Sequence, residues 1–512
     1  MRRVTSPRIA VAAPNALASW AGEQLAGQGG NAVDAAVAAM VVSCTTEPGI
    51  CSLGGGGFAT LAAPGAAPAT LDGYVAMPGI GGGDPGDPGF DLFTEYGGGV
   101  TITIGHGSVG TPGTPQLLVD LHRRAGHADW ADVLAPAEQV AREGFPLGTA
   151  SDLYLDLIHD DIYVWHAPSH AALHHVDGSR LVRGETVVVE HLARTLRTWA
   201  QDPATFSHGE LAELVVADVA ANGGALGHAD LRAYEVVERT PLAVELDGWR
   251  FWTNPPPAIG GAVVAMLLAG IGAPPAADGW SVDDRRRVVA ALRAVLGHRV
   301  DVLDLAEDRE AVGNAAVQAV LASGLAGLTA PSTVHVSAVD RDGLAVAITC
   351  SAGYGSGVMP PGTGVWLNNC LGEQELTRRG RQGYAPGERL PSNMAPTVGR
   401  AADGRVLAAG TPGADRITSS MLHVLAGVAG GMDVQAAIDA PRVHLTRRGD
   451  GSERLDVETG AELPADVAPD VARRSFEHPA MYYGAVSVAL RDADGGLLAA
   501  ADPRRDGGTV VV

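Results

Sequence analysis

Hydrophobic and polar residues alternate with a period of two in TVHVSAVDRDGLAVAITCS, residues 333–351, on both sides of Asp342 and Gly343. This period is typical of half-buried strands, and an Asp-Gly pair tolerates the positive φ angles of a tight turn, so the segment predicts a β-hairpin. With the turn within one residue of Asp342, the numbers of facing residues sum to about 683 to 685. This register places Thr333 opposite residues 350–352, near the hydroxyl of Ser351.

Upstream, the pattern predicts a helix that leads into a tightly packed turn. Asn31 precedes the Ala-rich run AVDAAVAAMVVS, and Asn is a favoured residue at a helix N-cap. Four consecutive glycines, residues 54–57, then lead into a predicted strand at 58–61. Because glycine lacks a Cβ, the run indicates backbone that is held at close range against other atoms.

The remaining pattern separates a helix-rich region from a strand-rich one. Helices are predicted at 115–142, 188–221 and 283–305, and a loop rich in Gly, Asp and Pro at 80–99. Strands and Gly-rich turns dominate the last third of the chain, where residues 485–508 predict a second hairpin. No internal repeat or Ser/Gly linker divides the chain. This order favours an α+β fold, with two antiparallel sheets flanked by helices in four αββα layers.

Composition and charge restrict the chemistry. The 512 residues are 46% hydrophobic and 18% charged, which is enough for a large core. All 36 basic residues are Arg, because the sequence contains no Lys, and this excludes both Schiff-base chemistry and a P-loop. Acidic residues number 58, and the resulting formal charge of −22 argues against a nucleic-acid partner.

The sequence shows no signal for export or for membrane insertion. Ser6, Pro7 and Arg8 interrupt the segment in which a signal peptide needs unbroken apolar residues. The most apolar stretch, residues 32–42, is shorter than a membrane span. We therefore expect a cytoplasmic protein without a membrane partner. The four cysteines lack the spacing of a zinc site and are expected to be small core residues.

A series of segments spread over nearly the whole chain resembles the γ-glutamyltranspeptidases, which are N-terminal nucleophile (Ntn) hydrolases. In chain order they are GGNAVDAAVAA, EPGICSLGGGGF, GTPGTP, DLRAYEVVERTPL, NPPPAIGG, TVHVSAVDRDG, YGSGVMPPGTGVWLNN, PSNMAPT, TPGADRI and DPRRDGG. Each segment alone is weak evidence, but together in the family's order they are specific. The resemblance implies the αββα sandwich of the Ntn hydrolases and an enzyme without a cofactor.

The resemblance also implies that the precursor cuts its own backbone between Ser332 and Thr333. The large segment, residues 1–332, and the small segment, residues 333–512, would then interleave in one domain as a heterodimer. A Thr hydroxyl is a poor nucleophile at neutral pH. The new α-amino group of Thr333 has an unperturbed pKa of about 8 and can accept the hydroxyl proton. The alternative for Thr333 is an ordinary β-branched strand residue, which the segment TVHVSAVD alone would predict.

Other residues match the family's catalytic positions. By resemblance, Ser351 supplies a hydroxyl that hydrogen-bonds the catalytic Thr, in agreement with the hairpin register; the alternative is an ordinary sheet hydroxyl. Gly413 and Ala414 match the pair whose backbone N–H groups form the oxyanion hole, and a backbone donor survives the added Cβ of Ala. Their alternative is a simple turn. Asn368 and Asn369 keep the family's Asn pair, which is expected to fix its loop.

The substrate-binding positions keep the family's pattern only in part. Glu373, Ser392 and Asn393 match an acidic residue and two serines that hold the α-amino and α-carboxylate groups of a γ-glutamyl substrate; a solvated loop carboxylate is the alternative for Glu373. Gly353 stands where relatives carry an Asn that also contacts the substrate. Residues 9–122 contain no Arg, so the guanidinium that clamps the α-carboxylate in relatives is missing. The short connection from Glu373 to Ser392 predicts an open pocket.

The sequence therefore predicts a γ-glutamyltransferase-like hydrolase that cleaves glutathione or another γ-glutamyl amide and passes the acyl group to water or an amino acid. The alternatives are an amidohydrolase or acylase for another acyl group and, from another class, a non-catalytic binding protein. No metal site is expected, because Pro168 interrupts the helical spacing of His166, His170 and His174. The glycines of residues 81–86 lack the flanking strand and helix of a dinucleotide site.

Overall fold

The computed structural model describes residues 8–82, 86, 89–94, 99–323, 334–448 and 450–512. Ser332 and Thr333, and with them the expected cleavage site, lie outside the described residues. Within the described part of the chain, no helix is both long and apolar enough to span a bilayer.

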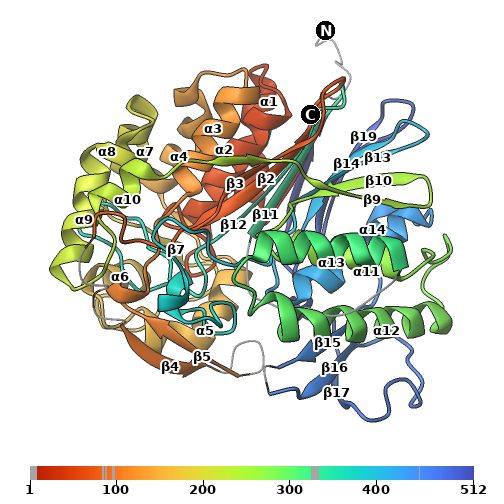
Figure 1. The fold of residues 1–512 in the computed structure, drawn as a ribbon. Coiled ribbons are helices and arrows are strands. Elements are labelled where there is room, and N and C mark those ends of the chain that lie inside the picture. Colours follow the sequence, from red (N-terminus) through yellow and green to blue (C-terminus); the bar gives the residue numbers. More distant parts are fainter. Residues whose placement is uncertain (1–7, 83–85, 87–88, 95–98, 324–333, 449) are drawn as a thin grey trace, which may run out of the picture.

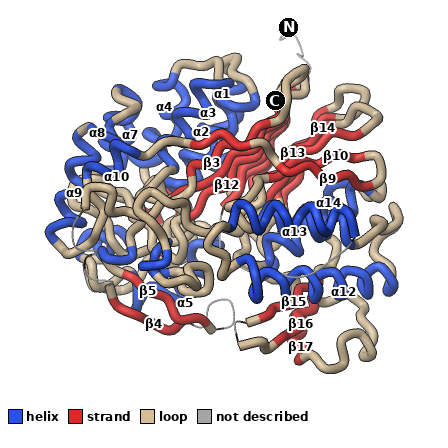
Figure 2. Tube along the Cα trace, viewed as in Figure 1, coloured by secondary structure: helices blue, strands red, loops and turns tan. Residues whose placement is uncertain are grey.

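Two large antiparallel sheets lie at the centre of the molecule (Figures 1 and 2). The first sheet has seven strands in the order β20 (Gly508–Val511), β1 (Ile9–Ala13), β11 (Val334–Asp340), β12 (Ala345–Ser351), β2 (Gly56–Ala62), β3 (Ala69–Gly73) and β8 (Val237–Arg239). The second has six strands in the order β19 (Leu497–Ala501), β18 (Ser487–Arg491), β14 (Val406–Gly410), β13 (Thr397–Ala401), β10 (Trp249–Thr253) and β9 (Leu242–Leu246).

Three smaller sheets lie outside this pair. They consist of β15 (Val443–Arg447), β16 (Glu453–Glu458) and β17 (Ala472–Phe476); of β4 (Phe90–Thr94) and β5 (Val100–Ile104); and of β6 (Phe145–Pro146) and β7 (Thr186–Val187).

Helices cover the outer face of each large sheet, so the four αββα layers predicted from the sequence are confirmed (Figure 1). On the first sheet α2 packs against β1, β11 and β12, on the second α11 and α14 pack against β9, β10 and β14, and β11 contacts β14 and β18 across the middle. The helices are α1 (Ala16–Gly27), α2 (Ala32–Thr46), α3 (Thr114–Ala125), α4 (Trp130–Glu143), α5 (Thr149–Ile162), α6 (Ala167–Leu173), α7 (Leu192–Gln201), α8 (Thr205–His208), α9 (Glu210–Ala221), α10 (His228–Ala233), α11 (Gly260–Gly270), α12 (Val282–His298), α13 (Arg309–Ser323), α14 (Arg416–Ala429) and α15 (Val434–Asp439).

Small side chains fill the space between the two sheets. Ala10 from β1, Ala347 from β12, Ala408 from β14 and Ala489 from β18 are all fully buried in one cluster there. Larger aliphatic residues form separate cores between each sheet and its helices. Because alanine is small, the two sheets can approach closely along the hairpin that carries the site.

The hairpin has the predicted register. Val334 of β11 faces Cys350 of β12, and His335 faces Thr349, so facing numbers sum to 684. On the other side of β11 lies β1, which also pairs with β20, and the N–H of Ile9 donates to the carbonyl of Val512 at 2.8 Å. The first sheet thus contains strands from before and after residue 333, and β1 lies between β20 and β11, which both follow that residue. The division of the precursor at that residue stays a prediction.

Local predictions are confirmed at the first long helix and wrong at two other places. Asn31 caps α2, where its side chain accepts hydrogen bonds from two backbone N–H groups in the first turn. The loop expected at 80–99 contains the strand β4, which pairs with β5. Pro168 does not interrupt a helix but lies in the first turn of α6, where its missing N–H removes no helical hydrogen bond.

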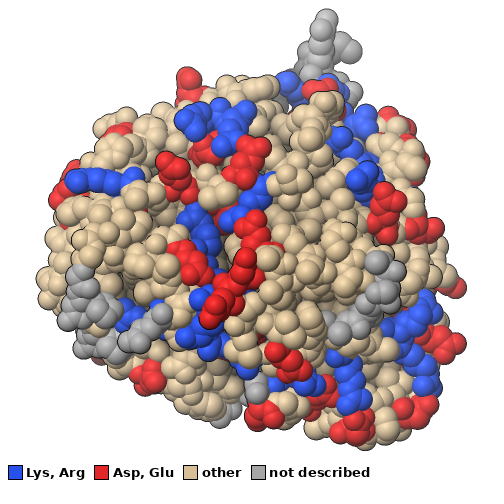
Figure 3. All heavy atoms as spheres, in the orientation of Figure 1, with Lys and Arg blue, Asp and Glu red and all other residues tan. Residues whose placement is uncertain are grey.

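The charged residues are mixed on the surface. On the face drawn in Figure 3, arginines lie beside acidic side chains rather than in a broad basic field. All four cysteines are buried and unpaired, as expected for small core residues.

Candidate active site

The open end of the β11–β12 hairpin defines the site. Val334 and Cys350 form its last described pair, so Ser351 lies where residue 333 would join β11. Ser351 is buried, and its hydroxyl accepts a hydrogen bond from the N–H of Gly353 at 3.0 Å. The contact between Ser351 and Thr333 stays a prediction, because Thr333 is outside the described residues.

The glycine run packs directly against this end of the hairpin. A Cβ added to Gly54 would lie 2.2 Å from the carbonyl oxygen of Trp366, and one added to Gly55 would lie 2.1 Å from that of Ser351. The other two glycines of the run are nearly as tight. Any side chain here would displace the backbone of the site, which is the close approach that the sequence predicted.

The Asn pair fixes the loop beyond the hairpin. Asn368 Nδ2 donates to the carbonyls of Gly54 and Gly110 at 2.8 and 3.0 Å, and its Oδ1 accepts from the N–H of Gly110 at 3.1 Å. Asn369 Oδ1 accepts from the N–H of Tyr354 at 2.7 Å. Both side chains form their hydrogen bonds with backbone groups, as expected for residues that fix a loop.

Glu373 lies inside the site, at the place where Gly353 leaves room. Gly353 has a φ of +68°, and a Cβ there would lie 2.4 Å from Asn369 Oδ1 and 3.0 Å from Glu373 Oε1. The Glu373 side chain is buried, and its Oε1 has no hydrogen-bond partner among the described residues. The alternative of a solvated loop carboxylate is therefore wrong. Glu373 Oε1 is thus a buried acceptor without a described partner, although hydrogen bonds from Cys370 and Tyr74 to the carboxyl act to lower its pKa.

Burial raises the pKa of Glu373 well above its usual value, and the nearby Glu375 raises it further. Glu375 is half-buried, desolvation of its carboxyl raises its own pKa, and its Oε1 accepts a hydrogen bond from the hydroxyl of Tyr354 at 2.6 Å. Two carboxyl groups so close in a dry environment resist simultaneous ionisation. A bound cation would favour the ionised form of Glu373.

Tyr74 joins Glu373 to the serine side of the pocket. Burial raises the pKa of the Tyr74 phenol, and Cys370, Glu373 and Ser392 are all close enough to affect it. The phenol oxygen lies 3.6 Å from the sulfur of Cys370. Sequence reasoning missed Tyr74. The one feature of the sequence that could have indicated Tyr74 is its position directly after the strand β3.

Ser392 and Asn393 lie on the backbone segment that packs against the start of α11. The carbonyl of Ser392 accepts a hydrogen bond from the N–H of Ile259 at 2.7 Å, and its hydroxyl accepts from the N–H of Met394 at 3.3 Å. The Asn393 side chain is buried, yet neither its Oδ1 nor its Nδ2 has a partner among the described residues. Buried amides are normally satisfied, so this one is available to a ligand.

Gly413 and Ala414 form a strained turn between β14 and α14. Their φ angles are +131° and +58°. The second value is in the left-handed region, which costs an alanine about 1–2 kcal/mol. Within the described part of the chain neither N–H has a hydrogen-bond acceptor. Two free backbone donors on a strained turn are what an oxyanion hole requires.

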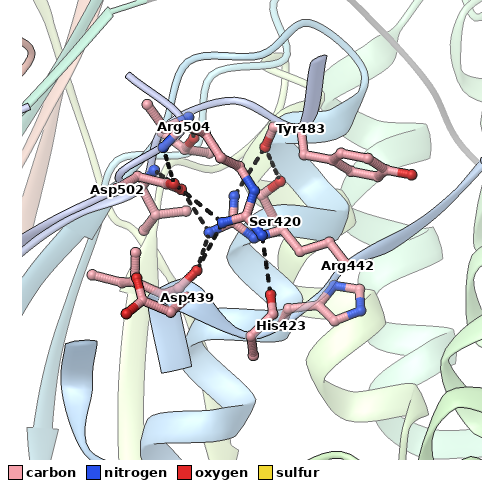
Figure 4. Close-up of polar contacts among 12 residues, drawn as sticks. Ser420, His423, Asp439, Arg442, Tyr483, Asp502 and Arg504 are labelled. Carbon is pink, nitrogen blue, oxygen red and sulfur yellow. Dashed lines mark hydrogen bonds and ion pairs between the residues drawn. The ribbon is translucent and has the colours of Figure 1, made fainter. Parts of the chain in front are cut away.

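A buried ionic cluster supports this turn from behind (Figure 4). A Cβ on Gly413 would lie 2.9 Å from the Cα of Gly484, so the turn packs on the backbone of residues 483–484. The carbonyl of Tyr483 accepts hydrogen bonds from Arg442 Nη1 at 3.1 Å and from Ser420 Oγ at 2.6 Å. Arg442 Nη2 in turn donates to Asp502 Oδ2 at 2.6 Å, and both side chains are fully buried.

A second buried chain of contacts holds the start of α14. The Ser419 hydroxyl lies 3.0 Å from His444 Nδ1, and His444 Nε2 lies 3.2 Å from Asp415 Oδ2. Despite burial, Arg416 and His444 hold the pKa of Asp415 below its usual value. The order resembles a Ser-His-Asp relay, but Ser419 has no exposed surface and its hydroxyl also donates to a helix carbonyl. These residues position the turn rather than attack a substrate.

The fold of the chain is shared with a protein of known structure. The cephalosporin acylase of Bacillus halodurans has the same fold, with a TM-score of 0.77 and 24% identity, over 100% of this chain and 97% of that one. The chain therefore has the αββα fold of that acylase. More specifically, it belongs to the γ-glutamyltranspeptidase family, whose model, gamma-glutamyltranspeptidase, matches residues 18–326 and 304–512.

Two curated relatives cover nearly the whole chain but have different names. The chain is 29% identical to a glutathione hydrolase proenzyme of Pseudomonas aeruginosa, over 98% of this chain and 94% of that protein. It is 28% identical to the acylase ACY 1 proenzyme of a Pseudomonas species, over 99% and 94%. The first relative is named for the hydrolysis of glutathione and the second as an acylase, so the two names differ in the substrate that they indicate.

Proposed function

We propose that this protein is an amide hydrolase that activates itself by cutting before Thr333 and then uses Thr333 as its nucleophile. The observation that carries this proposal is the pair of backbone N–H groups at Gly413 and Ala414, which have no acceptor among the described residues. The hairpin register supports it, because extending the pairing of Val334 with Cys350 by one residue would bring residue 333 opposite Ser351. The large and small segments would stay together, since β1 of the large segment pairs with β11 and β20 of the small one and β2 pairs with β12.

In the proposed reaction, Thr333 Oγ attacks the amide carbonyl while its own α-amine accepts the hydroxyl proton. The N–H groups of Gly413 and Ala414 donate to the oxyanion of the tetrahedral intermediate. The proton then passes to the leaving amine, the C–N bond breaks, and an acyl-enzyme ester remains. Water, or an amino acid in transfer, attacks this ester and releases the acyl group.

The first candidate for the acyl group is γ-glutamyl, as in glutathione. Among the described residues, the buried acceptor Glu373 Oε1 and the buried donor Asn393 Nδ2 both lack a hydrogen-bond partner. An α-ammonium would satisfy the first and an α-carboxylate the second. The glutathione hydrolase name of the Pseudomonas aeruginosa relative agrees with this candidate.

The second candidate is an acyl group without an α-carboxylate. It is favoured by the absence of Arg from residues 9–122 and by Tyr74, a neutral phenol placed between Glu373 and Ser392. A single amide donor holds a carboxylate less tightly than a bidentate guanidinium does. The acylase name of the second relative agrees with this candidate.

Two experiments test these proposals. A denaturing gel of purified protein should show two fragments that meet at Thr333, by N-terminal sequencing of the smaller one, and Thr333→Ala should remain one inactive chain. An intact chain with full amide-cleaving activity would overturn the mechanism. For the acyl group, turnover of a γ-glutamyl anilide is compared with that of the same anilide lacking the α-carboxylate. Equal kcat/KM values would favour the acylase candidate.

A further inference from the structure

Two histidines and an aspartate from distant parts of the chain meet away from the Thr333 hairpin. His106 belongs to the short 3-10 helix η2 (His106–Ser108), His166 precedes α6, and Asp218 lies on α9. One nitrogen of each imidazole and one carboxylate oxygen all lie within 4.8 Å of one another. It is the one group of three such ligands found among the described residues.

The distances suit a transition metal after a small closure. His106 Nε2 lies 3.1 Å from Asp218 Oδ2. Ligand atoms of a tetrahedral zinc site lie about 3.4 Å apart, since Zn–N and Zn–O bonds are about 2.0–2.2 Å long. The His106–Asp218 distance is within about 0.3 Å of this length. The third ligand atom lies no more than 4.8 Å from the other two, so it would have to move closer to bind the same ion.

The surroundings of the three residues orient and desolvate them. The second oxygen of Asp218 lies 3.4 Å from Asn222 Nδ2, which holds the carboxylate from its outer side. Trp165 packs edge-on against His106 and His166, with ring centroids 6.0 and 5.4 Å away. His106 is only 9% exposed. An outer-sphere hydrogen bond and an apolar wall are what metal sites use to fix their ligands.

The third ligand is linked to the loop that carries the Asn pair. His166 Nδ1 accepts a long hydrogen bond of 3.3 Å from the N–H of Met359. A metal on Nδ1 would replace this bond. A metal on Nε2 would require the proton to move to Nδ1, which would also end it. Metal binding therefore has to change the environment of Met359 whichever nitrogen is used.

We propose that His106, His166 and Asp218 bind one divalent transition-metal ion of the zinc type, with a fourth position left for water. Two imidazoles and one carboxylate suit Zn²⁺, Co²⁺ or Fe²⁺, whereas Mg²⁺ and Ca²⁺ prefer sites made of oxygen ligands. The ion would hold η2, α6 and α9 together, three elements separated by long stretches of chain. η2 also packs against the 3-10 helix η4 (Cys370–Gly372), which directly precedes Glu373. The ion would therefore stabilise the position of the segment that leads to Glu373.

The test uses tag-free, chelator-treated protein titrated with Zn²⁺ by calorimetry and with Co²⁺ by visible absorption. We expect one ion per chain, a Co²⁺ spectrum typical of imidazole ligation, and no comparable binding of Mg²⁺ or Ca²⁺. His166→Gln and Asp218→Asn should each weaken binding about tenfold or more. The matched control is His170→Gln, on the same helix, whose ring stacks on His174 at 3.9 Å outside the proposed site.

Each outcome decides for or against the site. Loss of binding in His166→Gln and Asp218→Asn, with retention in His170→Gln, supports it. Absence of saturable binding, equal binding in all variants, or loss only in His170→Gln would overturn it and leave His106 and Asp218 as an ordinary ion pair. Melting in chelator checks that the variants are folded. Hydrogen exchange of peptides containing Met359 should also change when Zn²⁺ is added to the parent protein and not to His166→Gln.

Discussion

The proposed oxyanion turn and the buried residues Glu373 and Asn393 differ in how their polar groups are held. Behind the turn, the Arg442 guanidinium donates to Tyr483, Ile438 and Asp502, although its Nε has no partner among the described residues. In the pocket, Glu373 and Asn393 are buried with polar atoms that have no described partner. The proposed oxyanion turn is therefore held by the protein's own hydrogen bonds. The unpaired atoms of Glu373 and Asn393 would find their partners on a bound ligand.

This difference predicts two kinds of variant. Changes behind the turn should lower stability and kcat, because they disturb a preorganised arrangement. Changes in the pocket should raise KM for the true substrate and can increase stability, because unpaired buried groups oppose folding. The variants below run from the largest expected effect to the smallest.

Arg442→Met should have the largest effect. It removes one of the two buried arginine partners of Asp502, leaving Arg504, and one of the two donors to the carbonyl of Tyr483, and breaking a buried ion pair costs up to about 3–5 kcal/mol. Urea unfolding measures the loss. The control is Arg286→Met, which removes an exposed pair with Asp466 and should change little. If both variants are equally stable, the cluster does not support the turn.

Gly413→Ala should lower kcat about 100-fold with little change in KM. The φ of +131° is strained for any residue with a side chain, and the new Cβ would lie 2.9 Å from the Cα of Gly484. The matched variant is Ala414→Gly, which adopts its φ of +58° without strain and should keep both kcat and stability. Steady-state kinetics with the best anilide compares them. A Gly413→Ala enzyme with normal kcat would exclude this turn as the oxyanion hole.

Glu373→Gln should reduce kcat/KM for a γ-glutamyl substrate roughly 30-fold, mainly through KM, because a buried charge contact of about 2 kcal/mol is lost. The substrate ammonium needs the ionised carboxylate. Since the pKa of Glu373 is raised, KM of the parent enzyme should fall as pH rises through that pKa, and KM of the variant should not. Glu375→Gln removes the neighbouring charge and should move the pH profile to lower pH. A KM that is equal in parent and Glu373→Gln at all pH values would contradict the proposed ammonium contact.

The same carboxyl makes a prediction for stability. A carboxyl whose pKa is raised by folding binds more protons in the folded state than in the unfolded state between the two pKa values. The free energy of unfolding contributed by Glu373 is therefore highest below its ordinary value of 4.5 and falls as pH rises toward the raised pKa. Thermal melts of Glu373→Gln should lack this decline.

Asn393→Leu should have the smallest effect, with opposite signs for stability and activity. Replacing an unpaired buried amide by an apolar group of similar shape should raise the free energy of unfolding by about 1 kcal/mol. It should reduce kcat/KM for a γ-glutamyl substrate about fivefold if Nδ2 contacts the carboxylate. Asn393→Ser, which restores a hydroxyl, should stay close to the parent. An unchanged kcat/KM in Asn393→Leu would favour the acylase candidate.

The fold could be predicted where the signal is local. The register of β11 and β12 followed from a period of two and an Asp-Gly turn, and the close packing at Gly54 followed from the glycine run. The strand β4 was missed because turn-forming residues surround it and its pairing with β5 is visible only in the structure. Pro168 was misjudged because proline ends a helix in its interior but begins one in its first turn.

The candidate site was predictable only where a family motif marked it. The motif marked Glu373, whose burial and unpaired oxygen no local pattern reveals. Arg442 and Asp502 are far apart in the chain and are charged residues that normally stay exposed, so nothing in the sequence predicted that they form a buried pair. His106, His166 and Asp218 are also far apart in the chain. The four-residue spacing of His166, His170 and His174 suggests a different group, and no sequence pattern links His166 to His106 or Asp218.

The pairing of β1 with β20 offers a route around self-cleavage. Ile9 and Val512 are hydrogen-bonded neighbours, so a short linker can close the chain into a circle without disturbing the first sheet. Opening that circle before Thr333 would give a rearranged polypeptide whose translation starts at the proposed nucleophile. After removal of the initiator methionine, such a permutant would have the free α-amino group of Thr333 without any cleavage before that residue.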